Sequence, residues 1–496
     1  MKEFLKKIGE HTFIFGIGNI IQGAISFLLL PVYLHYLTPY DFGILALLDI
    51  INMLFGSIIL QGIPTALFRS YSYDYVGQDI EQKEAVGTAF IYILISSFVF
   101  FGVLGLCAPY ITHVVFKDSN PVSLVRLIFL TGFLYSVTNI PFVVMRAKLQ
   151  SRLMITISIL RGLSTIILNV FFVAYMKMNV EGIVWGNLIP TAVMFFITPL
   201  LLKNDILWRL SFSKLKTMLS FGWPLVPSFI ASWILSSTDR YFIEHLSTTS
   251  ELGLYSLGFK IASIMTLVFL QPFQIAWPAV FFPKANDSDA ISIFQRFTTY
   301  FMLLGCGFGL GLILGAEPLI KIMGTKEYWS AYMVVPLVVF SLMLGVGGFQ
   351  EILNAGLYLK NKTKYIAVIT ILGAVINVAF NVVLIPHFGM MGAATATMIS
   401  SFMMVVFTYI ASSKFYKIKF QTFRLLHVLI VIIALMIVNL LTHTTSLIAM
   451  IFIKTLLLMS YPVLLYSTGF FTKDEKIWLG KIIHRVFNLC KPDISL

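Results

Sequence analysis

Three ionisable residues interrupt long apolar stretches of this 496-residue chain: Asp49, Arg161 and Lys260. On insertion scales, a charge at the centre of an apolar helix costs about 2.5–3.5 kcal/mol, so it normally faces a polar cavity or an opposite charge. These residues are therefore the first candidates for a functional site.

Cations outnumber acids among the charged candidates, which favours an anionic ligand. Guanidinium groups bind phosphate through two parallel hydrogen bonds, whereas an ammonium acts as a point charge. Near the ends of apolar stretches, an Arg or Lys can also extend to the membrane surface at little cost, which is an alternative for Arg240, Arg126 and Lys454. The candidate substrate-binding residues are Arg126, Arg161, Arg240 and Lys260, and the candidate ion-pair or coupling residues are Asp49 and Asp239.

Asp49 and Lys260 admit two compatible interpretations. They could form a buried ion pair that locks the protein in one state. They could instead line a cationic cavity that meets a lipid pyrophosphate or an acidic sugar, with the pair forming only when no substrate is bound.

The composition places these charges in a membrane protein. Hydrophobic residues make up 58% of the chain and charged residues 11%, and the mean hydropathy is +0.90. A soluble domain has roughly a quarter of its residues charged. Each span needs about 20 residues to cross about 30 Å of hydrocarbon. The sequence therefore predicts an all-α integral membrane protein.

Apolar stretches of spanning length predict about fourteen transmembrane helices. We expect them at 10–34, 41–65, 85–111, 123–145, 153–176, 182–202, 218–238, 253–281, 291–315, 331–352, 365–386, 391–412, 424–442 and 446–470.

Basic residues gather in the loops that follow even-numbered spans, whereas the loops 35–40 and 387–390 contain no Lys or Arg. The positive-inside rule then places both termini in the cytoplasm, which requires an even number of spans. The basic loop residues are Arg146, Lys148, Arg152, Lys203, Arg209, Lys214, Lys216, Lys360, Lys362, Lys364, Lys414, Lys417, Lys419 and Arg424.

An internal repeat relates the two halves of the chain. Asp41–Ile44 opens the second span and Glu251–Leu254 opens the eighth, 210 residues later. Gly182 and Gly392, which open spans six and twelve, are also 210 residues apart. The repeat predicts a six-helix lobe at 1–212, a second in the same orientation at 213–413, and two added helices with a cytoplasmic tail at 414–496. Repeats that face each other are typical of transporters with a midplane site.

Other functions lack their motifs. The net charge of +13 follows from topology rather than nucleic-acid binding, because no basic face carries interleaved aromatics. The chain has no phosphate-binding loop, no H-E-x-x-H motif and no clustered Cys and His, and its three cysteines give no disulfide framework. We therefore expect neither an enzyme nor a cofactor.

Three segments resemble a known family. Two of them, Ser236–Phe242 and Glu251–Ala262, lie in the second half of the chain. The third, Pro31–Gly43, lies in the first half. These segments resemble the bacterial O-antigen (Wzx-type) polysaccharide flippases, members of the multidrug/oligosaccharidyl-lipid/polysaccharide exporter superfamily. Asp239, Arg240 and Lys260 lie at matching positions.

The resemblance implies two six-helix lobes around a cationic cavity. It also implies that an undecaprenyl-pyrophosphate-linked oligosaccharide moves from the cytoplasmic to the outer leaflet of the bacterial inner membrane. Membrane lipid surrounds such a protein, which we expect to be a monomer, and a polysaccharide polymerase and a chain-length regulator are candidate partners.

Three alternatives stay open. A lipid II flippase is the closest. A cation-coupled multidrug exporter of the same superfamily would favour acidic residues in its cavity. A polysaccharide polymerase or ligase would be an enzyme with a large periplasmic loop, and the non-cytoplasmic loops here are short.

Overall fold

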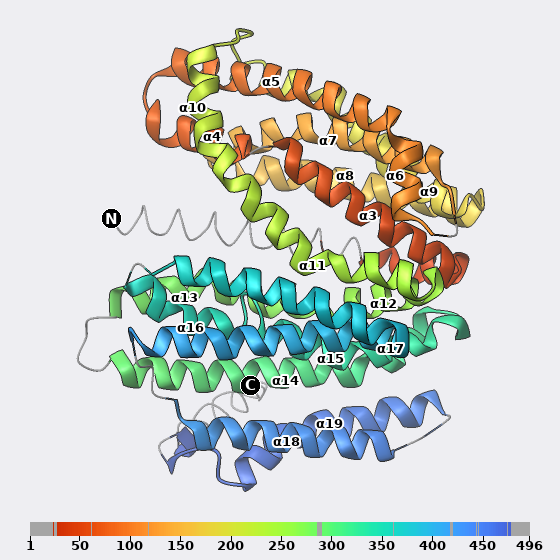
Figure 1. Cartoon of the computed structure of the whole chain (residues 1–496), viewed down its shortest axis with the longest axis vertical. Coiled ribbons are helices and arrows are strands. Elements are labelled where there is room, and N and C mark those ends of the chain that lie inside the picture. The colour runs from red at the N-terminus through yellow and green to blue at the C-terminus, as the bar shows by residue number, and fades with distance from the viewer. Residues whose placement is uncertain are drawn as a thin grey trace, which may run out of the picture. The chain divides into compact units, whose positions relative to one another are not determined.

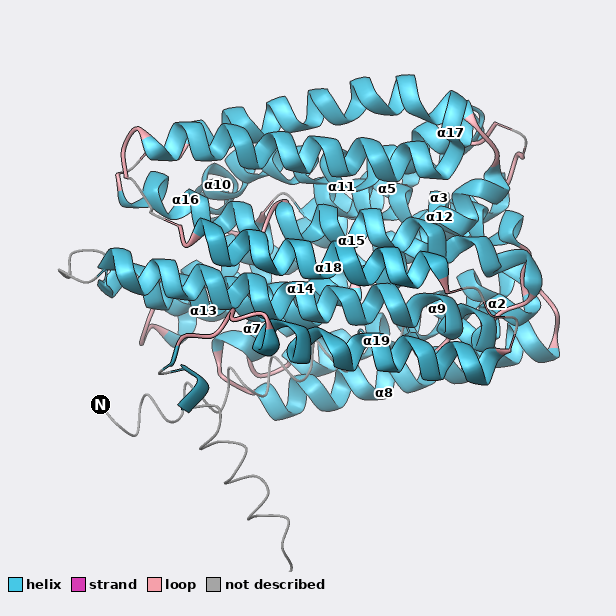
Figure 2. Cartoon of the chain, turned by 90° about the horizontal axis from the view of Figure 1, so that it is seen from below, coloured by secondary structure: helices cyan, strands magenta, loops and turns pink. Residues whose placement is uncertain are grey.

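The computed structural model describes residues 23, 27–60, 62–117, 119–284, 290–360, 362–416, 420–442, 444, 446–473 and 475–477. Figure 2 shows only helices and loops over these residues. Most of the predicted first span and the basic C-terminal tail lie outside them, so the cytoplasmic placement of both termini stays a prediction.

Helices of very different lengths follow one another along the chain (Figure 1). In order they are α2 (Leu30–Tyr36), α3 (Pro39–Leu60), α4 (Ile63–Arg69), η1 (Ser70–Asp74), α5 (Asp79–Leu106), α6 (Ala108–Val115), α7 (Val122–Ala147), α8 (Ser151–Asn169), η2 (Val170–Tyr175), α9 (Asn179–Leu202), α10 (Phe212–Gly222), η3 (Trp223–Leu225), α11 (Val226–Leu246), α12 (Thr249–Ala262), η4 (Thr266–Leu270), α13 (Gln271–Lys284), α14 (Ala290–Met323), η5 (Lys326–Val334), α15 (Val335–Leu344), α16 (Phe349–Leu359), α17 (Lys364–Ser413), α18 (Thr422–Leu441) and α19 (Leu447–Ser467).

Within the described residues, 11 helices are long and apolar enough to cross a membrane. This confirms the predicted all-α membrane fold. The predicted number of fourteen spans stays a prediction. The first span lies largely outside the described residues, one of the 11 helices contains two predicted spans, and the predicted span 218–238, which covers parts of α10 and α11, is not among the 11.

That helix is α17, whose 50 residues form two antiparallel arms. Gly389 breaks the helical backbone with a φ of 53°, a left-handed conformation that suits glycine. Across the resulting turn, the Asn377 side-chain amide donates to the Thr397 and Ser400 hydroxyls at 3.3 and 3.4 Å. The arms correspond to the predicted spans 365–386 and 391–412.

The described helices form two compact units. The first contains Met1–Ser263, Ile320–Ser341 and Ile366–Met404, and the second contains the rest. These units do not follow the internal repeat, and the lobes at 1–212, 213–413 and 414–496 stay a prediction.

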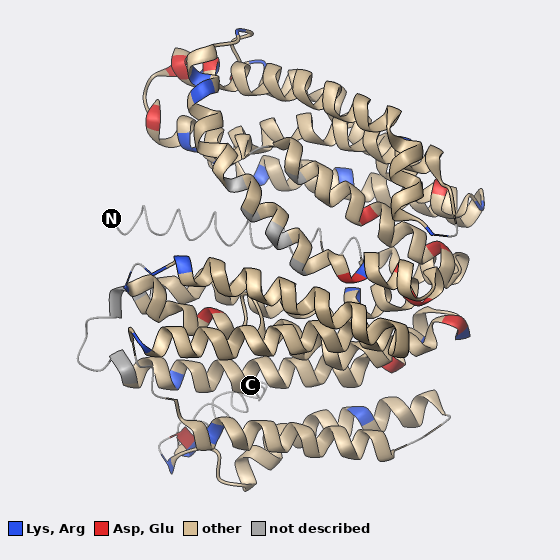
Figure 3. Ribbon diagram, in the orientation of Figure 1, with Lys and Arg blue, Asp and Glu red and all other residues tan. Residues whose placement is uncertain are grey.

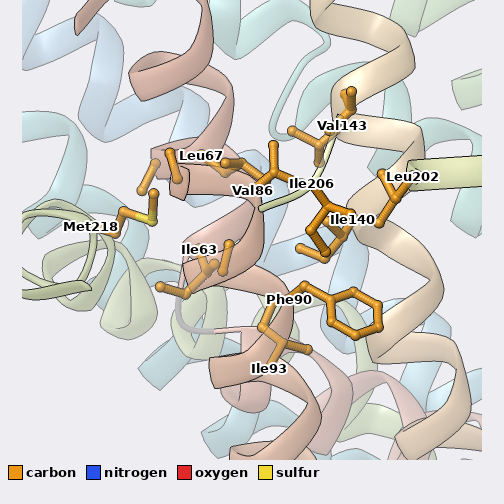
Figure 4. Packing of buried hydrophobic residues seen from close by; sticks show 14 of the residues in the cluster. Ile63, Leu67, Val86, Phe90, Ile93, Ile140, Val143, Leu202, Ile206 and Met218 are labelled. Atoms are coloured by element: carbon orange, nitrogen blue, oxygen red, sulfur yellow. The ribbon is translucent and has the colours of Figure 1, made fainter. Parts of the chain in front are cut away.

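An apolar cluster holds five helices of the first unit together. Figure 4 shows Ile63 of α4, Val86 of α5, Ile140 of α7, Leu202 of α9 and Met218 of α10 converging in it. All five side chains are buried. Inside a bilayer such packing stabilises through van der Waals contact, because lipid chains are as apolar as the cluster.

Polar contacts fasten α10 to α5 at the edge of this cluster. The Lys214 ammonium lies 2.6 Å from a Glu84 carboxylate oxygen and 2.5 Å from one of Glu81. Burial disfavours the charged ammonium, but its hydrogen bonds to Glu81 and Glu84 outweigh this effect and hold the pKa of Lys214 above its ordinary value.

In the second unit, α18 and α19 lie side by side (Figure 1) and are joined to α14 by two charged contacts. Lys454 of α19 forms an ion pair with Glu317 of α14. Arg424 pairs with Glu475 at 2.7 Å, and the Tyr300 hydroxyl of α14 donates to Glu475 at 2.6 Å. Lys454 is therefore held by an opposite charge instead of extending to the membrane surface.

Local geometry recurs at the 210-residue offset of the repeat. The Thr38 hydroxyl accepts from the Asp41 backbone N–H at 3.2 Å at the start of α3, and Thr248 does the same for Glu251 at the start of α12. Each threonine thereby satisfies one of the unpaired N–H groups at a helix start. The matching caps begin α3 and α12 at equivalent positions of the two repeats.

Glycines in these equivalent positions bring α3 and α12 into reciprocal contact. A Cβ on Gly43 would lie 2.1 Å from the Thr249 carbonyl oxygen, and a Cβ on Gly253 would lie 1.9 Å from that of Pro39. Thr249 follows Pro39 by the same 210 residues that separate the glycines. Each helix therefore needs its glycine to approach the first turn of the other.

We predict that Gly43→Val lowers the thermal unfolding midpoint, because its side chain must push α12 away and overpacking costs about 1–3 kcal/mol. Gly56→Val on the same helix is the matched control, since a Cβ there meets nothing within 4 Å. Equal midpoints for the two variants in a detergent-solubilised melting assay would show that the close approach is not needed.

Candidate functional site

A cavity of about 290 Å³ in the first unit collects several of the predicted residues. Its walls come from α3, α11 and α12, with Ser263 just after α12. The polar lining consists of Asp49, Ser237, Arg240, Ser256, Lys260 and Ser263, and the apolar lining of Phe42, Leu45, Ala46, Ile50, Met53 and Phe259. Figure 3 shows how sparse charges are along most of the helices, which makes three charged residues in one cavity notable.

Helical periodicity explains this lining. The α3 residues 42, 45, 46, 49, 50 and 53 recur every three or four positions and so share one helix face. The α12 side contributes residues 256, 259, 260 and 263 with the same spacing. Because the glycine contacts bring the beginnings of α3 and α12 together, these two faces meet along the same cavity.

Asp49 attracts the two cations of the cavity without forming an ion pair with either. Asp49 interacts electrostatically with Lys260 most strongly and then with Arg240. Among the described residues, Asp49 has no Lys or Arg nitrogen within 4 Å, and Lys260 has no hydrogen-bond partner. The locked ion pair is thus not formed in this structure.

Arg240 is positioned by neutral groups. Its Nη1 donates to the Ser236 carbonyl oxygen at 3.0 Å, and its guanidinium carbon lies 4.7 Å from the centre of the Phe259 ring. The hydrogen bond uses one of five guanidinium N–H groups. The guanidinium therefore keeps donors for a further acceptor at the cavity wall.

Asp239 is not part of the cavity lining, although it precedes Arg240. Its side chain is buried, with 4% exposed. Its carboxylate accepts hydrogen bonds from the Tyr255 hydroxyl and, at 2.9 Å, from the Arg240 backbone N–H. The coupling role predicted for Asp239 stays a prediction, and the structure places this residue in a hydrogen-bonded network behind the cavity.

Arg161 and Arg126 lie elsewhere. Arg161 lines a second cavity of about 300 Å³ between α8 and α9. Arg126 is exposed on α7, where its Nε donates to the Gly105 carbonyl oxygen at 3.2 Å. The structure therefore groups Arg240, Lys260 and Asp49, and separates them from the other two cations.

Sequence reasoning missed several polar residues of the first cavity. Ser256 and Ser263 lie four residues before and three after Lys260, so helical spacing from that lysine could have found them. Behind the cavity, the Tyr255 hydroxyl gave no such signal, because only the packing of α12 against α11 brings it to Asp239.

Comparison with known proteins identifies the family. A family model described as "Polysaccharide biosynthesis protein" matches residues 35–333, which is more than half of the chain. The protein belongs to the polysaccharide biosynthesis protein family. This confirms the family predicted from the Asp239–Arg240 and Lys260 segments, and both segments fall within the matched range.

One curated relative of this polysaccharide biosynthesis family member comes from Haloferax volcanii and is named "Probable low-salt glycan biosynthesis flippase Agl15". It is 27% identical over 219 residues, which cover 42% of this chain and 45% of the relative. The chain thus matches less than half of that relative's length.

Solved structures share the fold of this family member. The lipid II flippase MurJ in an inward closed conformation matches 92% of this chain and 99% of its own, with a TM-score of 0.70 and 14% identity. An inward-facing multidrug resistance MATE family transporter of the MOP superfamily matches 81% of this chain and 98% of its own, with a TM-score of 0.64 and 13% identity. At such identities the likeness concerns the fold alone.

We predict that Tyr255→Phe lowers the thermal unfolding midpoint, because the buried Asp239 carboxylate loses a hydrogen bond and such a loss costs about 1–3 kcal/mol. Tyr73→Phe serves as the control, since that side chain is 77% exposed. An unchanged midpoint for Tyr255→Phe would mean that Asp239 does not depend on this hydroxyl.

Proposed function

We propose that the protein is a flippase that moves undecaprenyl-pyrophosphate-linked oligosaccharide units from the cytoplasmic to the outer leaflet by alternating access, for cell-surface polysaccharide synthesis. The observation that carries the proposal is the cavity in which Lys260 and Arg240 have no carboxylate within 4 Å, among the described residues. The family match and the glycan flippase relative support the same substrate class.

The cavity chemistry suits a pyrophosphate. The Lys260 ammonium supplies a mobile point charge, and the Arg240 guanidinium supplies a planar set of donors. Serine hydroxyls at 237, 256 and 263 add neutral donors and acceptors that suit sugar hydroxyls. In this proposal the polar head occupies the cavity while the polyprenyl chain stays in an apolar environment.

Asp49 supplies the counter-charge when no substrate is bound. Its carboxylate attracts Lys260 and Arg240 electrostatically without contacting them. An arriving pyrophosphate replaces it as their partner, so the cavity cations always have an anion nearby. This arrangement lowers the cost of keeping two cations in the membrane between transport cycles.

The excess of cations separates this proposal from a drug exporter. A site for cationic drugs needs acidic groups, whereas this cavity contains two cations and one acid. A lipid II flippase shares the pyrophosphate and polyprenyl chemistry, so it is the second candidate.

The proposal extends to the cellular setting. We place the protein in the bacterial inner membrane with both termini in the cytoplasm, acting as a monomer and as a transporter rather than an enzyme. The lobes at 1–212 and 213–413 are then the parts that alternate access. A polymerase and a chain-length regulator would act on the translocated unit.

The test is transbilayer movement of a lipid-linked oligosaccharide in liposomes containing the purified protein. We predict that Lys260→Gln and Arg240→Gln each slow the movement about tenfold or more, because a hydrogen bond to a charged group contributes about 1.5–3 kcal/mol. Lys260→Arg keeps the charge and should retain most of the rate. Lys177→Gln, at an exposed loop residue, is the control.

Two results would overturn the proposal. One is movement that proceeds at the wild-type rate in both Gln variants. The other is no movement of any lipid-linked oligosaccharide tested, together with export of a cationic drug, which would favour the exporter. Movement of lipid II alone would favour the second candidate.

A further inference from the structure

The second cavity is an apolar groove with a single charge in it. Residues 157, 160, 161, 164 and 168 form one face of α8, and residues between 189 and 201 form the facing side of α9. Apart from Arg161 and Ser164, the lining is Ile, Leu, Val, Met and Pro. The α8 face extends about 16 Å along the helix axis.

Arg161 is satisfied only in part. Its Nη2 donates to the Thr191 hydroxyl at 3.1 Å, and its guanidinium carbon lies 5.1 Å from the centre of the Tyr135 ring. Neither group carries a negative charge. In the part of the chain that the structure describes, no Asp or Glu oxygen comes within 4 Å of this guanidinium.

Lys454 is a comparable membrane-embedded cation, and it has a carboxylate partner within the protein. In the second unit, the buried Lys454 side chain has the Glu317 carboxylate as a direct partner. A membrane-embedded guanidinium without such a partner is costly, and an anion supplied by another molecule would neutralise it. Since the walls beside Arg161 are apolar, that molecule must carry hydrocarbon next to its anionic group.

Depth identifies which anionic lipid fits. Arg161 lies about ten residues into the 25-residue span Ser151–Tyr175, or about 15 Å along its axis. The hydrocarbon core is about 30 Å thick, so this position is near its middle. Phosphates of resident phospholipids stay at the membrane surface. A lipid phosphate reaches this depth only while its head group crosses the membrane.

We propose that the groove between α8 and α9 binds the transported lipid at mid-membrane depth. Arg161 binds the phosphate that is attached to the polyprenyl chain, and the apolar faces of α8 and α9 hold the first isoprenoid units of that chain. This inference rests on the proposed function and adds to it a binding site for the lipid part of the substrate, separate from the head-group cavity lined by Lys260.

The test is equilibrium binding of undecaprenyl phosphate to the purified full-length protein in detergent, followed by native mass spectrometry. Arg161→Gln should weaken binding about tenfold or more, since a hydrogen bond to a charged group contributes about 1.5–3 kcal/mol. Val193→Trp fills the groove without changing its charge and should weaken binding as well.

The matched controls lie on the same helices but outside the groove. Arg152→Gln on α8 and Phe196→Trp on α9 replace exposed residues that do not line it, and both should bind as wild type. Thermal unfolding of each variant checks that it is folded. If Arg161→Gln does not fold, Val193→Trp against Phe196→Trp decides the question.

Competition identifies the ligand. The proposal requires that an equal concentration of phosphatidylglycerol or of inorganic pyrophosphate leaves undecaprenyl phosphate bound. Displacement by phosphatidylglycerol would mean that the groove takes a resident phospholipid. Displacement by pyrophosphate would mean that the groove does not bind the polyprenyl chain of the ligand. Either result overturns the proposal, as does wild-type binding by both groove variants.

Binding and transport can fail separately. If wild type moves lipid-linked oligosaccharide but binding ignores Arg161 and Val193, the groove inference fails while the proposed function stands. If binding depends on both residues but wild type moves no lipid-linked oligosaccharide, the proposed function fails while the groove remains a site for a polyprenyl phosphate.

Discussion

The cost of an unpaired charge in hydrocarbon constrains the ionisable side chains that lie within the membrane-spanning helices of this protein. Lys454 is matched by Glu317, and Asp239 is surrounded by the Tyr255 hydroxyl and a backbone N–H. Among the described residues, Lys260 and Arg240 have no carboxylate within 4 Å, and they lie instead at a cavity whose described lining includes one acid, Asp49. The membrane-embedded charges therefore divide into those that hold helices together and those available to a ligand.

Close packing at two equivalent glycines makes the cavity possible. Gly43 and Gly253 let α3 and α12 touch backbone to backbone near their first turns. From that contact, one face of each helix borders the same space, which brings Asp49 near Lys260. A repeat that begins each helix with a threonine cap and places a glycine soon after it therefore fixes both the contact and the position of the charges.

Fold and chemistry answer different questions about this family member. Its likeness to MurJ and to a MATE family transporter establishes an architecture shared by proteins whose names indicate very different substrates. The fold therefore cannot decide between them. The charges that line the cavity add a chemical criterion, because a cation-rich wall repels cations and attracts phosphates.

The sequence by itself determined the all-α membrane class, the family and the identity of the charged residues. These follow from local properties, since a helix in lipid satisfies its own backbone and needs about 20 apolar residues. The sequence could not tell which charges meet. Only packing showed that Arg240 shares a cavity with Asp49 and Lys260, that Asp239 lies behind this cavity, and that Arg161 belongs to a separate groove. Such groupings depend on helix rotation and on contacts between residues far apart in the chain, which hydropathy and spacing do not encode.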